Sequence, residues 1–263
     1  MTVTILKLLR ILPLLVILVS TNVICQNNIG IVEYQETDEF NYKGIKSFYT
    51  LYFDNNYSLY EENLNKATFG EMDFNESDGT ITTIKLPYRD KPKFNFFDFK
   101  NNSSMFSISP FGNYTIVNDK DEKISWSLMG ETKKIGNFEC QKAKAHFRGR
   151  NYYVWFTTEI PLSTGPWKLN GLSGLILEVQ EENGLIHIIA TSINLKAENA
   201  YIQKKIGQYT NPKTTISFKD YLKILTDFDQ KYERIMNSKL SKGQSPITDS
   251  YSFWSLELYP EMN

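Results

Sequence analysis

The sequence predicts a mainly β protein: an antiparallel curved sheet or open barrel, followed by a C-terminal amphipathic helix. Aromatic residues make up 14% of the chain. Short segments rich in Tyr, Phe, Ile and Thr recur about every ten residues between clusters of Asn, Asp, Gly and Lys, which is typical of antiparallel strands. No helical pattern of about ten to fifteen residues separates these segments, so a parallel sheet with crossover helices is not expected.

The first 25 residues have the layout of a secretory signal peptide. Lys7 and Arg10 form a basic region, and an apolar run follows over residues 11–19. This run is shorter than the roughly 20 apolar residues that span a bilayer, so no transmembrane anchor is expected in the mature chain. Cleavage before Gln26 would release the mature chain to the periplasm or the medium.

The cysteines allow an alternative at this end of the chain. Cys25 could instead carry a lipid anchor, although bacterial lipoproteins normally place a residue smaller than Ile24 before that cysteine. If cleavage removes Cys25, Cys140 remains alone and no internal disulfide can form. Loss of the two basic residues of the signal peptide leaves 27 of the 29 basic residues, against 30 acidic residues. A chain this close to neutral gives no electrostatic argument for a nucleic-acid partner.

Residues 26–263 are predicted to form a single domain, with β structure over residues 26–200. Gly149, and the pair Asn183-Gly184, mark turns that join consecutive strands as hairpins. The candidate strands are residues 30–36, 47–53, 79–86, 94–99, 104–109, 113–117, 123–129, 139–147, 150–158, 174–182 and 185–195.

A helix is predicted at about residues 217–240, followed by a C-terminal tail over residues 241–263. Ser217 is a plausible N-cap, and Asp220 places a negative charge near the helix start. Packing of the apolar stripe against the protein's own sheet is preferred over partner binding. The stripe has spacings of three and four residues and consists of Phe218, Leu222, Leu225, Phe228, Tyr232, Ile235 and Met236.

The stretch from Gly165 to Val179 places glycines inside strongly apolar sequence. Ser173 there only superficially resembles a hydrolase nucleophile, because Gly174 follows it directly and the chain continues as a strand. Gly171 and Gly174 are expected to bracket a turn that needs either positive φ or close backbone approach.

The sequence predicts no catalytic residue, no metal site and no cofactor. His146 and His187 stand on different hairpins without other ligands at metal spacing. Cys140 lies six residues from His146, roughly 20 Å along a strand, and is interpreted as a small buried side chain. No spacing singles out a pair among the dispersed acidic residues, which include Asp98, Asp119, Asp121, Glu159, Glu178 and Glu181.

Residues 124–179 closely resemble the GLPGLI family of exported proteins from gram-negative bacteria. The resemblance covers about a quarter of the chain and implies no enzymatic activity, cofactor or catalytic residue. The family carries proline where Ser173 stands, so a serine hydroxyl is not what this motif requires. The residues that match the family, which are interpreted as structural, are Trp126, Cys140, Gly149, Arg150, Trp155, Pro161, Gly165, Pro166, Gly171 and Gly174.

Two functions from different classes remain open. The first is a non-enzymatic envelope protein that carries an apolar ligand such as a lipid, or that serves an outer-membrane transporter. The second is a secreted hydrolase with a carboxylate or Cys140 site assembled in space. A cleft with converging acidic and basic side chains would favour the hydrolase, whereas an apolar concavity would favour the carrier.

Overall fold

The computed structural model describes residues 29–38, 45–66, 70–75, 81–86, 90–109, 113–119, 122–238 and 257. The predicted signal peptide, with both possible fates of Cys25, lies outside the described residues. So does the predicted tail, apart from Glu257.

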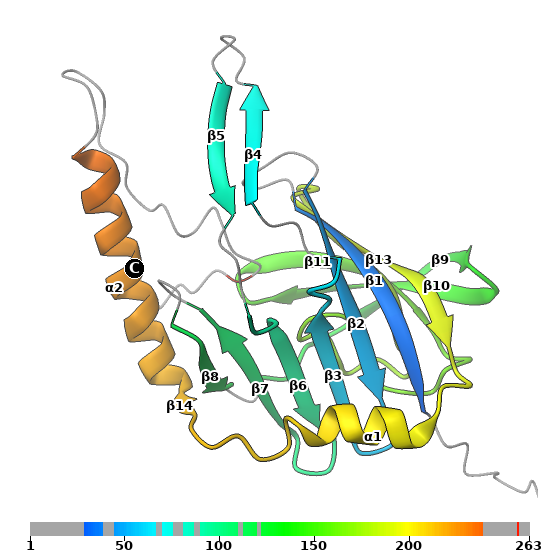
Figure 1. Cartoon of the computed structure of the whole chain (residues 1–263). Helices are drawn as coiled ribbons and strands as arrows, with labels where there is room; N and C mark the ends of the chain where they lie inside the picture. The colour runs from blue at the N-terminus through cyan, green and yellow to red at the C-terminus, as the bar shows by residue number, and fades with distance from the viewer. Residues whose placement is uncertain are drawn as a thin grey trace, which may run out of the picture.

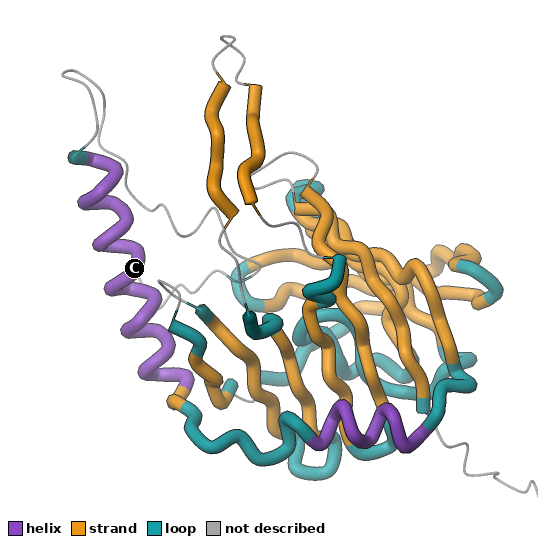
Figure 2. The backbone as a smooth tube through the Cα atoms, viewed as in Figure 1, coloured by secondary structure: helices purple, strands orange, loops and turns teal. Residues whose placement is uncertain are grey.

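Strands dominate the described chain and confirm the mainly β prediction (Figures 1 and 2). Twelve strands form one sheet, in the order β14-β8-β7-β6-β3-β2-β1-β13-β12-β11-β10-β9. Strands β4 and β5 pair as a separate hairpin. The bounds are β1 Gly30–Asp38, β2 Ile45–Phe53, β3 Tyr57–Glu62, β4 Gly70–Asn75, β5 Ile81–Leu86, β6 Phe94–Asp98, β7 Ser103–Ile108, β8 Thr115–Asn118, β9 Ser127–Ile135, β10 Phe138–Phe147, β11 Arg150–Thr157, β12 Leu175–Glu181, β13 Ile186–Asn194 and β14 Ile216–Ser217.

The large sheet is curved and unclosed, as predicted. In Figure 1, β8, β7, β6, β3, β2 and β1 form one wall, and β9 to β13 lie behind it. Neighbouring strands are antiparallel except for the short parallel contact of β14 with β8. Register shifts at Glu33/Tyr34, Gln141/Ala143 and Trp155/Phe156 interrupt the ladders. Such bulges bend strands and increase their twist, which helps the sheet to curve.

The connection between β11 and β12, residues 158–174, packs inside the curve of the sheet. Thr164 Oγ1 donates a 3.0 Å hydrogen bond to Ser58 Oγ on β3. The Tyr34 hydroxyl on β1 donates to the Ile176 carbonyl at 2.7 Å. The chain therefore fills much of its own concave side. The buried apolar residues of this connection, all part of the main core, are Ile160, Leu162, Trp167, Leu169 and Leu172.

Two helices are described, one of them predicted. Helix α2, Phe218–Asn237, begins where expected: the Asp220 backbone N–H donates to Ser217 Oγ at 3.1 Å. Its residues Tyr221 and Leu225 pack on the sheet in a cluster with Phe106, which confirms that this end of the stripe faces the protein's own sheet. The side chains of Phe228, Tyr232, Ile235 and Met236 lie outside the described residues.

Helix α1, Asn199–Gly207, was not predicted from the sequence. Its Ile202 and Ile206 pack against Tyr52, Leu59 and Phe94 of the sheet. These two isoleucines make up the whole buried face of the helix, which is too short to give a clear periodic signal.

The strands differ from the predictions in two informative places. Strand β3 was missed because Glu61 and Glu62 are polar, yet both are buried in the structure. Strand β9 begins at Ser127 and continues through the charged run to Ile135, rather than ending at Met129. It is an exposed end strand of the sheet, so little of it needs to be apolar.

Candidate functional site

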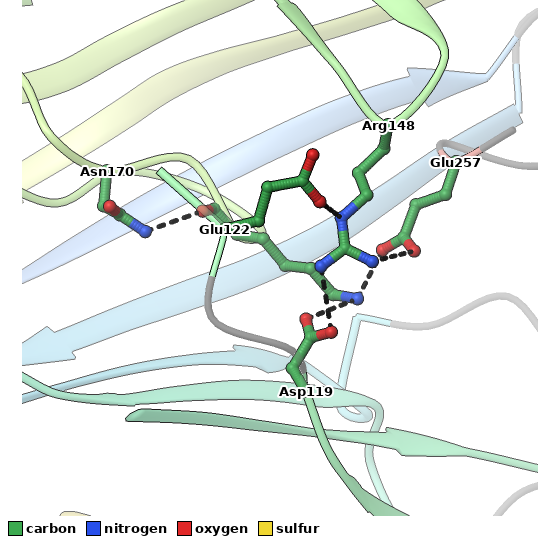
Figure 3. A network of polar contacts seen from close by, with 6 residues as sticks. Asp119, Glu122, Arg148, Asn170 and Glu257 are labelled. Atoms are coloured by element: carbon green, nitrogen blue, oxygen red, sulfur yellow. Dashed lines mark hydrogen bonds and ion pairs between the residues drawn. The ribbon is translucent and has the colours of Figure 1, made fainter. Parts of the chain in front are cut away.

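Charged residues from distant parts of the sequence converge between the two walls (Figure 3). Arg148 lies at the centre, with Asp119 Oδ1 3.0 Å from Nη2 and Glu122 Oε2 3.0 Å from Nε. Lys168 Nζ lies 2.9 Å from Asp119 Oδ2 and also pairs with Glu257. Glu257 Oε2 is 3.7 Å from Arg148 Nη1. We call these five residues, Asp119, Glu122, Arg148, Lys168 and Glu257, the buried ion cluster.

Local backbone geometry sets the positions of the two cations. Arg148 and Gly149 form the tight turn between β10 and β11, with φ values of 50° and 74°. This confirms the predicted turn at Gly149. Lys168 follows Trp167, whose φ of 58° is unusual for a bulky residue. The Trp167 ring is fixed between Phe147 and Tyr152, so packing holds the chain in this conformation.

The buried ion cluster is nearly dry. The side chains of Asp119, Arg148, Lys168 and Glu257 are each 7% exposed or less, whereas Glu122 is 38% exposed. Burial raises the pKa of Glu257, helped by the Asp119 charge, and the attraction of Lys168 and Arg148 does not fully offset this. Burial is thus the main reason why Glu257 disfavours its charge, and the excess of three carboxylates over two cations adds to it. The cluster therefore ties the two walls together.

The raised pKa of Glu257 gives a pH prediction. The pKa of such a carboxyl group is higher in the folded state than in the unfolded state. Its contribution to stability is therefore greatest below the unfolded-state pKa and is lost as the pH rises through the folded-state pKa. In the Glu257→Gln variant the side chain at position 257 is neutral at every pH. The stability of this variant relative to wild type should therefore improve as the pH rises from about 4 to 7. Urea unfolding of both proteins across this range measures the difference, and a constant or opposite trend would contradict a raised pKa.

A small cavity lies beside the cluster. Ser58, Asn95 and Ser104 of the sheet line one side, and Lys168 and Asn170 of the β11–β12 connection line the other. Its volume of about 30 Å³ suits roughly two water molecules. In this structure the cavity is too small for a lipid chain or an oligosaccharide.

The candidate nucleophiles lack the surroundings that catalysis needs. Cys140 is 1% exposed, and burial raises the pKa of its thiol to about 11. A thiolate is therefore disfavoured at neutral pH. Ser173 is exposed and stands two residues before β12. His146 is an exposed residue whose Nδ1 lies 2.9 Å from Asn151 Oδ1. Within the described ranges, no three His, Cys, Asp or Glu residues are placed to hold a metal.

The dispersed carboxylates have different fates. Asp119 joins the buried ion cluster, and Glu181 Oε1 lies 3.8 Å from Arg150 Nη1. Asp98 accepts hydrogen bonds from Asn101 in a turn. Glu159 accepts one from the Glu139 backbone N–H at 2.8 Å. Asp121 lies outside the described residues.

The residues of the family-like motif have mainly architectural contacts. Trp126 Nε1 donates to the Asn170 carbonyl at 2.8 Å, beside Gly171, whose φ is 96°. A Cβ at Gly174 would lie 2.1 Å from the Thr157 carbonyl oxygen. These two glycines thus satisfy the predicted need for positive φ and close approach. Gly165 packs on Ile176 where a Cβ would lie 2.7 Å away. Pro161 and Pro166 belong to the same connection.

A second group of polar residues lies over β9 to β13, each strand providing one residue. Lys133 on β9 pairs with Glu178 on β12, and its Nζ lies 4.4 Å from the Trp155 ring centroid on β11. His187 Nε2 on β13 is 3.0 Å from Glu178 Oε1. Lys142 on β10 lies opposite Trp155. We call these residues, Lys133, Lys142, Trp155, Glu178 and His187, the five-strand face.

Sequence reasoning missed the five-strand face because His187 and Glu178 were considered without their strand register. Burial raises the pKa of Glu178, but hydrogen bonds from His187 and Lys133 and their charges outweigh it, so the net pKa is lowered. Glu178 therefore remains an ionised acceptor, with a side chain that is only 11% exposed. Part of this arrangement was accessible from the sequence, because a two-residue turn at Arg148-Gly149 places Lys142 opposite Trp155.

None of the helices in the described part of the chain is both long and apolar enough to cross a membrane. No curated protein matches the chain. Two solved structures of PNGF-II, in the C2 and P21 space groups, are similar in fold, with TM-scores of 0.51 and 0.52 and 19% identity. Each match covers 76% of this chain, but 33% and 34% of the PNGF-II chains. The chain thus spans about a third of the length of those structures.

A family model described as N-glycanase peptide, N-terminal domain, matches residues 76–220. This segment contains the β11–β12 connection, the whole five-strand face and all of the buried ion cluster except Glu257. It also contains residues 124–179, whose resemblance to the GLPGLI family stays a prediction. Because the match extends over more than half of the sequence, the chain belongs to the N-glycanase peptide N-terminal domain family.

Proposed function

We propose that the protein is an exported, non-enzymatic binding module for glycan-bearing ligands. The family description refers to an N-glycanase, and this chain corresponds to about a third of the PNGF-II structures. A single domain of this family can bind the type of molecule on which an N-glycanase acts without catalysing a reaction. Export rests on the predicted signal peptide.

The observation that carries this proposal is that the chain's own groups occupy its interior. Residues 158–174 pack inside the curved sheet, and Arg148 and Lys168 engage the converging carboxylates. Carriage of an apolar ligand therefore finds no support in the described residues. A ligand is expected to bind on the surface, where the five-strand face offers ordered polar and aromatic groups.

A pair of matched probes tests the proposal. An N-glycosylated peptide and the same peptide without its glycan are titrated into the purified exported protein by calorimetry. The glycopeptide should bind more tightly by at least about tenfold, which corresponds to 1.4 kcal/mol. Mass spectrometry of the same mixture should find the glycan still attached after prolonged incubation. Equal affinity for both peptides would overturn the proposed ligand class.

A secreted hydrolase is the second candidate, because Asp119 and Glu257 converge on Arg148 and Lys168 beside a polar cavity. Release of glycan in the mixture would favour it over the binding module. Glu122→Gln is then the informative variant, since Glu122 is the most exposed acid of the cluster. Loss of release in a variant with an unchanged melting temperature would place the chemistry at the cluster.

An accessory role at an outer-membrane transporter is a further alternative that experiment can test. Affinity capture of the protein from intact envelopes distinguishes it, because a transporter recovered from deglycosylated and untreated envelopes alike would indicate a protein partner. Recovery that depends on glycosylated material would support the binding module.

A further inference from the structure

The five-strand face has the organisation of a prepared binding surface. Cross-strand pairing places Lys142 opposite Trp155, and Trp155 opposite Glu178. Lys133 and His187 reach Glu178 from the two outer strands of this group. Five neighbouring strands of a hydrogen-bonded sheet thus hold one connected network, so its side chains are positioned by rigid elements rather than by loops.

Two aromatic rings provide the apolar part of this surface. Trp155 and Tyr153 are both partly exposed and stand two residues apart on β11. Alternate residues of a strand share a face and lie about 7 Å apart. Lys142 Nζ lies 5.7 Å from the Trp155 ring centroid and 5.2 Å from that of Tyr153. The two rings therefore form a short platform, with the Lys142 ammonium group over both of them and that of Lys133 over Trp155.

Charged groups of both signs surround the platform. Glu178 is an acceptor fixed by His187 and Lys133. Lys142 is paired with Glu131 at 3.3 Å. The two lysines and the two glutamates balance in charge, so the surface does not select strongly for an anionic or a cationic partner. It combines aromatic faces with fixed donors and acceptors, which is the pattern that suits a neutral ligand with many hydroxyl groups and apolar ring faces.

We propose that the five-strand face, together with Tyr153, is a saccharide-binding site in which sugar rings lie along Trp155 and Tyr153. Hydroxyl groups of the sugar donate to Glu178 and accept from Lys142 and Lys133. The site rests on the proposed binding function, but it adds a location and a mode of contact that the fold and the family do not specify.

The test uses the free trimannosyl-chitobiose core oligosaccharide as probe, titrated into the full exported protein by calorimetry. Trp155→Ala should weaken binding at least about tenfold, because buried aromatic anchors dominate recognition surfaces. Tyr201→Ala is the matched control: Tyr201 is an aromatic residue of α1 with 51% exposure, away from the five-strand face. This control should bind as the wild type does.

Trp155 also packs partly against the core, so its removal can affect folding. Lys142→Ala and Tyr153→Ala provide variants with less risk, and each should weaken binding while the melting temperature stays within a few degrees of wild type. Wild-type affinity in these two folded variants would overturn the site and leave the proposed function intact. Absence of any saccharide or glycopeptide binding by the wild type would instead remove the proposed function.

Discussion

Replacement of Gly174 by valine is expected to abolish stable folding or to lower the melting temperature by at least about 10 °C, corresponding to several kcal/mol for a domain of this size. A Cβ there would lie 2.1 Å from the Thr157 carbonyl oxygen and 2.6 Å from its carbon. These are backbone atoms of the neighbouring strand and cannot rotate away. Circular dichroism during heating, together with the yield of soluble protein, measures the effect.

Gly130→Val is the matched control for this substitution. A Cβ at Gly130 has open space around it, with no atom within 4 Å, and the residue lies in the exposed strand β9. Valine suits a strand, so the control should retain the wild-type melting temperature within a few degrees. If both variants melted like the wild type, close backbone approach would not be the reason for glycine at position 174.

Replacement of Asp119 by asparagine is the second change with a large expected effect. Asp119 pairs with both Arg148 and Lys168. Its loss would leave these cations with Glu122, which is partly exposed, and Glu257, whose raised pKa disfavours its charge. Removal of one partner from a buried ion pair costs about 3–5 kcal/mol. Chemical denaturation of the wild type and the variant at neutral pH should therefore show a strongly lowered midpoint.

An exposed ion pair gives the comparison for Asp119→Asn. Lys134 and Glu139 lie 3.3 Å apart with side chains that are 70% and 63% exposed. Glu139→Gln should change the free energy of unfolding by no more than about 1 kcal/mol. Similar small losses in both variants would mean that water reaches the cluster and that it does not lock the walls together.

Local patterns predicted much of the fold. Recurring segments rich in Tyr, Phe, Ile and Thr located most strands, and the apolar stripe located α2. Gly171 and Gly174 could be recognised as turn residues because their requirements concern their own backbone. Strand β3 escaped this approach, since its buried Glu61 is held by Lys205 and Tyr209, which lie far away in the sequence. No local sequence pattern predicts such a distant partner.

The buried ion cluster could not be predicted for a related reason. Asp119, Arg148 and Lys168 stand in separate connections of the sheet, and Glu257 comes from the C-terminal region. The curved twelve-stranded sheet brings them together, and the sequence does not mark the bulges that help it to curve. The five-strand face was partly accessible, because one recognised turn sets the β10–β11 register. Its Glu178 depends on the shift at Trp155/Phe156.

The place of Glu257 in the chain also sets an order of events during synthesis. Lys168 emerges from the ribosome well before its partner Glu257, so a growing chain must hold this ammonium group with Asp119 alone or leave it in water. The dry arrangement of charges can be completed only after residue 257 has been made. Final closure of the two walls is therefore a late step in folding, and nascent chains that end before residue 257 should remain loosely packed.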